Sequence, residues 1–160
     1  MTSPYIREIR LIADHVLAIP ECFTPHHVSS ACAMEFRAVP CANPHASEFV
    51  AYPDGGPFSS IVFRGPRTGA VGSHALVIMH VARDVRITRA DMAGNFELPT
   101  ENTRVDPRIP PEGAVSFTSE HGARNLRIRF HARSQLLRDI SVHESRGRAR
   151  SLGSGSGSPE

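Results

Sequence analysis

Histidine is the residue type in this chain with the widest range of possible chemistry, because it can bind a metal ion or carry a positive charge. The 160 residues include nine histidines. His74 and His80 are six positions apart, so they would share one face of a strand. At about 3.3 Å per residue they lie too far apart to bind one ion directly. His131 would have to join them from another strand, and no spacing typical of a zinc site is present. The sequence therefore predicts no metal and no cofactor, with His74, His80 and His131 as candidate ligands only if a metal is found.

The motifs of common enzyme classes are also missing from the sequence. It has no Gly-x-Ser-x-Gly turn for a serine nucleophile, and it lacks the lysine that a phosphate-binding Gly-x-x-x-x-Gly-Lys loop needs. Cys22, Cys32 and Cys41 are spaced ten and nine residues apart, which fits no metal or redox motif, so we expect reduced thiols. The sequence therefore favours a protein without enzymatic activity.

Arginine side chains are the stronger candidates for binding, because a guanidinium group can form paired hydrogen bonds with a carboxylate. Arg104, Asp106 and Arg108 lie in a segment with four prolines, which we predict to be a long loop at 99–112. Arg127 and Arg129 alternate with apolar residues, so they are expected on the outward face of a strand. We predict that these five residues bind a protein partner through packing between subunits, with arginine side chains meeting carboxylates. The outward face of Arg127 and Arg129, with His131 and with Arg86 if its strand lies near, could bind an acidic partner.

The charge balance argues against nucleic acid as the main partner. The formal net charge is only +2, which is too small to hold a phosphate backbone by electrostatics alone. Arg146, Arg148 and Arg150 fall at alternate positions in the C-terminal segment. We expect from them at most a weak, salt-dependent contact with nucleic acid.

The elements that position these residues are predicted mainly as strands. Residues 74–82 form a short apolar run that is typical of a strand buried on both faces. After a turn at Arg83 and Asp84, residues 84–89 alternate between apolar and polar types, which predicts a neighbouring strand with one exposed face. Further strands are predicted at 33–39, 48–52, 60–64, 95–98, 114–119 and 125–131, and the last two form a hairpin.

Other segments are less regular. Residues 5–18 fit a helix that starts at Ser3-Pro4, or a strand, with the helix favoured. Residues 20–32 contain Pro20, Pro25 and the pair His26-His27, and we predict a loop there. Near the C-terminus, a short helix from 134 to 140 and a final strand at 139–143 are both compatible with the pattern.

Seven to nine short strands with proline and glycine turns predict an all-β fold. We expect a β-sandwich, a jelly roll or a small barrel, with a possible short N-terminal helix. Residues 1–144 would form a single domain, and residues 145–160 a disordered Arg/Gly/Ser tail. No signal peptide or apolar stretch of about 20 residues is present, so we expect no membrane contact and an intracellular or virion location.

Several short fragments of the chain resemble motifs of the trimeric dUTPase-like β-barrel family, and they occur in the same order along the sequence. They are Ala18-Ile-Pro20, Arg37-Ala-Val-Pro40, Phe63-Arg-Gly65, Arg89-Ala-Asp91 and the C-terminal Gly/Ser segment. Asp54-Gly-Gly stands in place of the family's Ser-Gly-Leu phosphate turn, and Ser60-Ile-Val replaces its water-orienting acidic residue. The resemblance implies a non-catalytic, nucleotide-handling relative.

Two function hypotheses follow from these observations. The first is a non-enzymatic interaction or assembly module, such as a viral structural protein, which forms a homo-oligomer or larger assembly through loops and sheet edges. The alternative is a small β-barrel ligand-binding protein or enzyme, metal- or nucleotide-handling, with His74, His80, Asp91 and His131 converging in a cleft.

Overall fold

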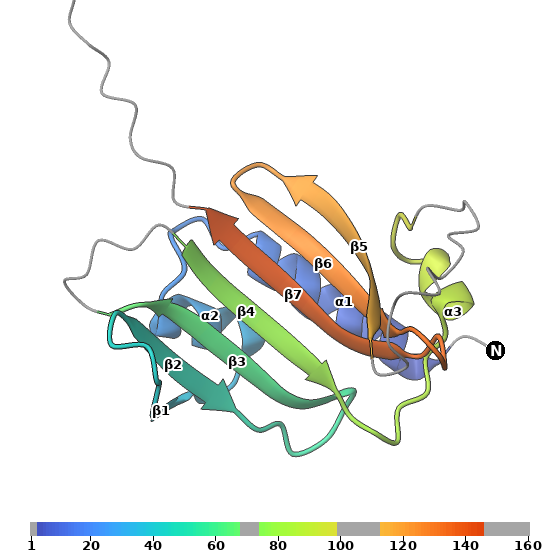
Figure 1. Cartoon of the computed structure of the whole chain (residues 1–160), viewed down its shortest axis with the longest axis horizontal. Helices are drawn as coiled ribbons and strands as arrows, with labels where there is room; N and C mark the ends of the chain where they lie inside the picture. Colours follow the sequence, from blue (N-terminus) through green and yellow to red (C-terminus); the bar gives the residue numbers. More distant parts are fainter. Residues whose placement is uncertain (1–2, 68–73, 99–112, 146–160) are drawn as a thin grey trace, which may run out of the picture.

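The computed structural model describes residues 3–67, 74–98 and 113–145, and one antiparallel sheet dominates it (Figure 1). Seven strands lie in the order β1-β2-β3-β4-β7-β6-β5, so β1 and β5 form the two edges. The strands are Arg37–Val39 (β1), Ala46–Ala51 (β2), Phe58–Pro66 (β3), His74–Val81 (β4), Ala114–His121 (β5), Arg124–His131 (β6) and Leu137–Ser145 (β7). The all-β fold is confirmed, with a strand count at the lower end of the expected range.

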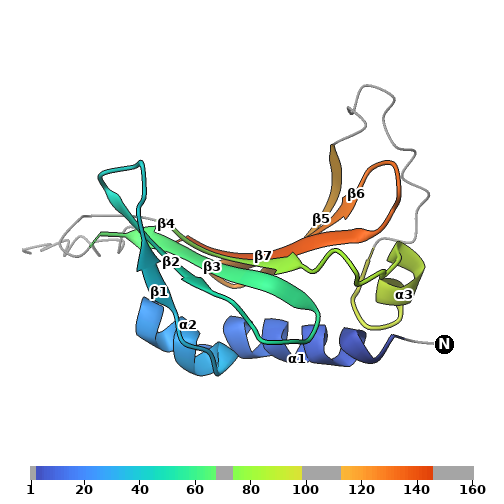
Figure 2. The same cartoon turned by 90° about the horizontal axis from the view of Figure 1, so that it is seen from below.

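Helices form the second layer of the molecule. α1 (Pro4–Leu17) and α2 (Pro25–Cys32) cover one face of the sheet, and α3 (Arg89–Ala93) lies near the N-terminal half of α1 (Figure 2). The described strands therefore form one open sheet, and not a sandwich of two sheets, a jelly roll or a closed barrel. The apolar side of α1 supplies the partner that the sheet needs to bury its own apolar face.

The helix alternative for residues 5–18 is confirmed. The Ser3 side chain accepts a hydrogen bond from the Tyr5 backbone N–H, and proline follows at the first helical position. Ile6, Ile9 and Val16 recur at helical spacing and are fully buried against the sheet. The alternation that also allowed a strand is therefore incidental to a helix with one apolar side.

The prediction of a loop over residues 20–32 is wrong in its second half, because α2 lies there. Thr24 caps this helix by accepting a hydrogen bond from the His27 N–H, and Pro25 occupies the first turn. Ala33 ends it in a left-handed conformation, with φ of 53°. Proline disrupts the interior of a helix, but after Thr24 it starts a helix in the same way as Pro4 does after Ser3.

β4 is the central strand that the sequence predicts, but its neighbours are β3 and β7. Its residues alternate between buried and half-buried, so only one face is enclosed. The strand predicted at 84–89 is absent, although Val85 and Ile87 are buried in the hydrophobic core. Thr88 makes a single bridge to Leu136. The strand predicted at 95–98 is also absent, because the chain leaves α3 in a turn.

The hairpin of β5 and β6 is confirmed, with Phe117 opposite Ile128 in its register. The segment after it is the final strand, β7, rather than a helix. Because β7 pairs with both β6 and β4, it joins the hairpin to the first four strands. The tail predicted at 145–160 lies outside the described residues from position 146 onward.

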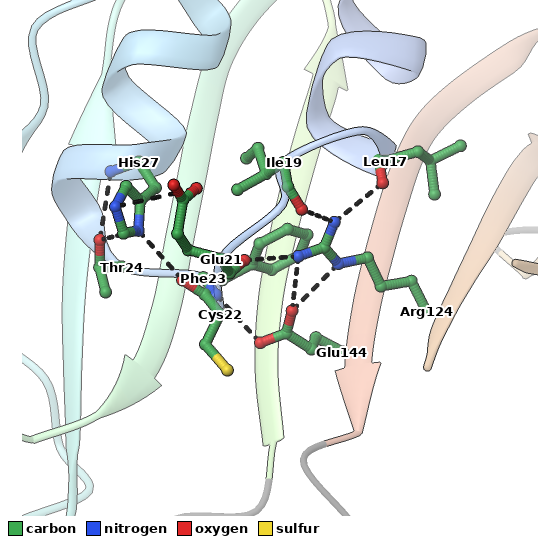
Figure 3. Close-up of polar contacts among 9 residues, drawn as sticks. All are labelled: Leu17, Ile19, Glu21, Cys22, Phe23, Thr24, His27, Arg124 and Glu144. Carbon is green, nitrogen blue, oxygen red and sulfur yellow. Dashed lines mark hydrogen bonds and ion pairs between the residues drawn. The ribbon is translucent and has the colours of Figure 1, made fainter. Parts of the chain in front are cut away.

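A buried ion pair fastens the segment between α1 and α2 to the sheet (Figure 3). Arg124 on β6 donates from Nε and Nη2 to the Glu144 carboxylate on β7, at 3.0 and 2.9 Å. Its guanidinium also donates to the backbone carbonyl oxygens of Leu17, Ile19 and Glu21. The second Glu144 oxygen accepts from the Phe23 N–H at 3.0 Å, and the Phe23 ring lies 4.2 Å from the Arg124 guanidinium carbon.

Candidate functional site

The candidate site is the face of the sheet that α1 and α2 leave uncovered, which we call the open face. Among the described residues, no element covers it (Figure 2). The register places Val62 beside Ile78, and Ile78 beside Ser141. Val62, Leu76 and Ile78 are half-buried and stand apart from the residues packed in the core. The centre of the open face is therefore apolar.

Arginine side chains lie on the open face next to this apolar centre. Arg129 on β6 binds Asp139 on β7 through two hydrogen bonds, Nε to Oδ1 and Nη2 to Oδ2, both 2.7 Å long. Asp139 is fully buried, and Arg138 approaches the same carboxylate at 3.7 Å. Arg127 lies opposite Ser141 and is exposed. Within the described ranges it has no acidic partner, so its positive charge is uncompensated.

A hollow of about 370 Å³ lies at the end of the open face where β3, β4 and β7 meet. His45 enters it from the segment before β2, His74 from the start of β4, and His143 from β7. Arg64 also lines the hollow, but Glu48 on β2 holds its Nη2 at 2.6 Å. The hollow is thus lined by three imidazole side chains and by an arginine that is already paired with a carboxylate.

His143 is the most perturbed of these histidines. Its pKa is lowered, first by partial burial and then by the positive charges of Arg127 and Arg129 and by His74. The lowered pKa favours the neutral form of the imidazole over the protonated form. An anion bound beside it would remove part of the repulsion and favour protonation.

Arg127 and Arg129 lie together on the outward face of β6, as the alternation predicts. The structure also brings His74 and His143 to the same face, and His143 was missed. Asp139, Ser141 and His143 recur at every second position of β7, and this spacing in the sequence predicts that they share one face of the strand. The predicted loop residues Arg104, Asp106 and Arg108 lie outside the described residues.

The other predicted residues do not converge. His80 pairs with Asp139 in the β4–β7 register, and His131 pairs with Ala114 at the other end of the hairpin. Asp91 accepts the backbone N–H of Thr88 at the start of α3, and this bond lowers its pKa. Over residues 3–67, 74–98 and 113–145, no three histidine, cysteine or acidic side chains are placed to hold a metal ion.

The three cysteines are free thiols in different surroundings. Cys22 is exposed, Cys41 is partly exposed and Cys32 is buried. Burial raises the pKa of Cys32 to about 11, so this thiol is held protonated and unreactive. Cys32 belongs to the core beneath α2 rather than to a site.

Comparisons with three kinds of known protein data found no match for this chain. No family model, no curated protein and no solved structure matches it. Within the described part of the chain, no helix has the length and apolar character needed to cross a membrane.

Proposed function

We propose that this protein is a non-enzymatic interaction module whose open face binds an acidic segment of a partner protein. The observation that carries the proposal is the position of Arg127. It is exposed, has no acidic partner among the described residues, and lies on the same face as the apolar centre formed by Val62, Leu76 and Ile78. Such a combination suits a peptide that offers both carboxylates and apolar side chains.

The charges of the open face favour an acidic ligand over a basic one. Glu48 compensates Arg64, and Asp139 compensates Arg129. Among the described residues, Arg127 is left to attract a carboxylate. The same charge balance disfavours nucleic acid as a ligand, because binding a phosphate backbone requires several uncompensated cations at once.

The setting in which the module works is part of the proposal. If the acidic segment belongs to a second copy of the chain, the result is a homo-oligomer. If it belongs to another protein, the result is a mixed assembly, of which a virus particle is one example. The β1 and β5 edges offer a second route to assembly, because their outer backbone groups have no strand partner among the described residues.

The test uses a fluorescein-labelled peptide of alternating glutamate and valine, with binding followed by fluorescence anisotropy at low salt. We expect Arg127→Glu to weaken binding by about tenfold or more, because a charge-assisted contact becomes a repulsion. Arg7→Glu is the matched control, because Arg7 is exposed on α1, away from the open face. The control should bind as the unmodified protein does.

Three outcomes would overturn the proposal. They are equal binding of a lysine–valine peptide, equal loss of binding in both variants, and binding of a single-stranded oligonucleotide with the same dependence on Arg127. Sedimentation of the untagged protein over a range of concentrations then separates a second copy from a different partner. Self-association that Arg127→Glu abolishes would assign the acidic segment to a second copy.

A further inference from the structure

A second pocket, of about 460 Å³, lies on the opposite side of the sheet, between α1, the segment after α3, and the β5–β6 hairpin. Leu126 and Ile128 on β6 line it together with Phe96 from the segment after α3, and all three are buried. Leu17 contributes from the last turn of α1. Much of the lining is therefore apolar and belongs to the border of the core.

The pattern along β5 changes where it reaches this pocket. Its inward positions begin with Val115 and Phe117, which pack on the core. The next two inward positions, Ser119 and His121, are polar, although the β6 residue opposite Ser119 is still the apolar Leu126. Ser119 is half-buried and His121 is exposed, so both polar side chains lie at the solvent edge of the apolar lining rather than in the core.

Ser119 and His121 form a hydrogen-bonding pair at the rim of the pocket. The Ser119 Oγ lies 3.0 Å from the His121 Nε2, and both residues line the pocket. A hydroxyl and an imidazole together can both donate and accept a hydrogen bond. They could therefore hold an oxygen atom of a ligand in either role.

The charged residues of the pocket largely neutralise one another. Arg10 binds the Asp14 carboxylate through Nε, at 3.0 and 3.2 Å, and its guanidinium lies 5.1 Å from the centre of the Phe96 ring. Glu97 is a further lining residue and is exposed. With one cation against two carboxylates, the pocket does not favour an anion.

We infer that this pocket binds a small, uncharged and mainly apolar molecule that carries a hydroxyl or carbonyl oxygen. Its apolar body would lie on Phe96, Leu126 and Ile128, and its oxygen would meet Ser119 and His121. The volume falls within the range of small-molecule sites. The site is separate from the open face and does not depend on the proposed function.

The wall that carries Phe96 is ordered by its own backbone bonds. The N–H groups of Asn95 and Phe96 donate to the Met92 carbonyl oxygen, at 3.0 and 2.9 Å, and the Leu98 N–H donates to the Phe96 oxygen at 2.8 Å. Met92 is fully buried, which anchors this turn in the core. The pocket is therefore largely formed before a ligand arrives, which reduces the entropy lost on binding.

The experiment compares 1-naphthol with naphthalene, which have the same fused rings and differ by one hydroxyl. The chain has no tryptophan, so naphthol fluorescence can be followed without interference from indole. We expect the double variant Ser119→Ala, His121→Ala to weaken naphthol binding by about three- to tenfold, the usual effect of lost hydrogen bonds. Naphthalene binding should be unchanged, because its contacts are apolar.

A glycine variant tests the location of the site. Gly94 lines the pocket with φ of −76°, and a Cβ added there would meet no atom within 4 Å. Gly94→Leu should therefore fold normally, fill part of the pocket and weaken both probes. Gly55→Leu is the control, since a Cβ at Gly55 is equally free of contacts and lies in the turn between β2 and β3.

Amide chemical shifts identify the surface that the probes touch. We expect naphthol to shift the amides of residues 95–98 and 126–128, and to leave Val62 and Ile78 on the open face unchanged. The inference is overturned if neither probe binds up to its solubility limit, if Gly94→Leu binds like the unmodified protein, or if the shifted amides lie on the open face. Equal losses for naphthol and naphthalene in the double variant would overturn the role of Ser119 and His121.

Discussion

The polar contacts of Arg124 on β6 join this strand both to β7 and to the C-terminal end of α1. Arg124 binds Glu144 on the neighbouring strand, the carbonyl oxygen of Leu17 at the end of α1, and two carbonyl oxygens in the segment that follows α1. Its side chain is 11% exposed and that of Glu144 only 5%. Neither group can turn to water if the other is removed, so the pair must be kept or replaced as a unit.

We predict that Arg124→Ala lowers the free energy of unfolding by about 3–5 kcal/mol, the usual cost of leaving one partner of a buried ion pair alone. Urea denaturation followed by circular dichroism measures the change. Arg10→Ala is the control, because its ion pair with Asp14 is about half exposed and should contribute less than about 1 kcal/mol. If the two variants lose the same free energy of unfolding, burial is not the reason for the contribution of the Arg124–Glu144 pair.

His143 makes stability depend on pH. Its folded-state pKa is lowered by partial burial, by Arg127 and Arg129, and by His74. The unfolded chain therefore binds a proton more readily than the folded chain as the pH falls through the ordinary histidine range near 6.5. The folded state loses stability in that window, and stability is regained as the pH rises above it.

We predict that His143→Gln reduces the fall in melting temperature between pH 7 and pH 5. A histidine titration by NMR should place the pKa of His143 below 6.5 in the free protein. Arg127→Ala should raise that pKa by removing a positive charge, and the Glu–Val peptide of the binding test should raise it too. An unchanged pKa in Arg127→Ala would mean that the two side chains do not interact.

At the scale of elements, the two helices that cover the sheet start with the same signal, a residue with a side-chain hydroxyl followed by proline. Ser3-Pro4 begins α1 and Thr24-Pro25 begins α2. They end differently, because Ala33 closes α2 with φ of 53°. A residue with a Cβ is strained in this conformation, whereas glycine is not.

We predict that Ala33→Gly raises the free energy of unfolding by about 0.5–1 kcal/mol by relieving this strain. Ala33 is exposed, so little packing is lost. Ala31→Gly, inside the same helix, should lower stability by about 1 kcal/mol, because glycine weakens helix interiors. Thermal unfolding of the two variants, compared with the unmodified protein, shows whether each substitution raises or lowers stability. If both substitutions lower stability, the strain at Ala33 is refuted.

At the scale of the whole molecule, protection of the backbone should follow the strand order. β4 has a partner on each side and is packed on the core. Among the described strands, β1 and β5 each have one neighbour, and β1 has only three residues. Opening at an edge breaks fewer bonds and exposes less apolar surface than opening at the centre. The sheet is therefore expected to open from its two edges.

We predict that amide hydrogen exchange is slowest in β4 and β7 and fastest in β1 and β5. Mass spectrometry of peptic fragments measures this order. If exchange in β5 slows as protein concentration rises, that edge pairs with another copy of the chain. Exchange in β5 as slow as in β4 at low concentration would contradict the strand order.

Local patterns were enough to predict the strand-dominated fold, α1 and the β5–β6 hairpin. Each of these depends on residues close together in the sequence, such as the alternation from Leu126 to Phe130. The false strand at 84–89 shows the limit of this reasoning. Val85 and Ile87 are buried and Arg86 is exposed, as predicted. The segment nevertheless forms only a single bridge, from Thr88 to Leu136, and no strand.

The sequence by itself therefore determined the buried sides of α1 and of the β5–β6 hairpin, and that Arg127 and Arg129 would share an outward face. Only the tertiary structure decided what they face. Strand order brought β7 between β4 and β6, which placed Asp139 against Arg129 and His143 near Arg127, across ten or more residues of chain. Periodicity specifies the face of a residue within its own strand, whereas pairing between strands depends on non-local packing that no local pattern encodes.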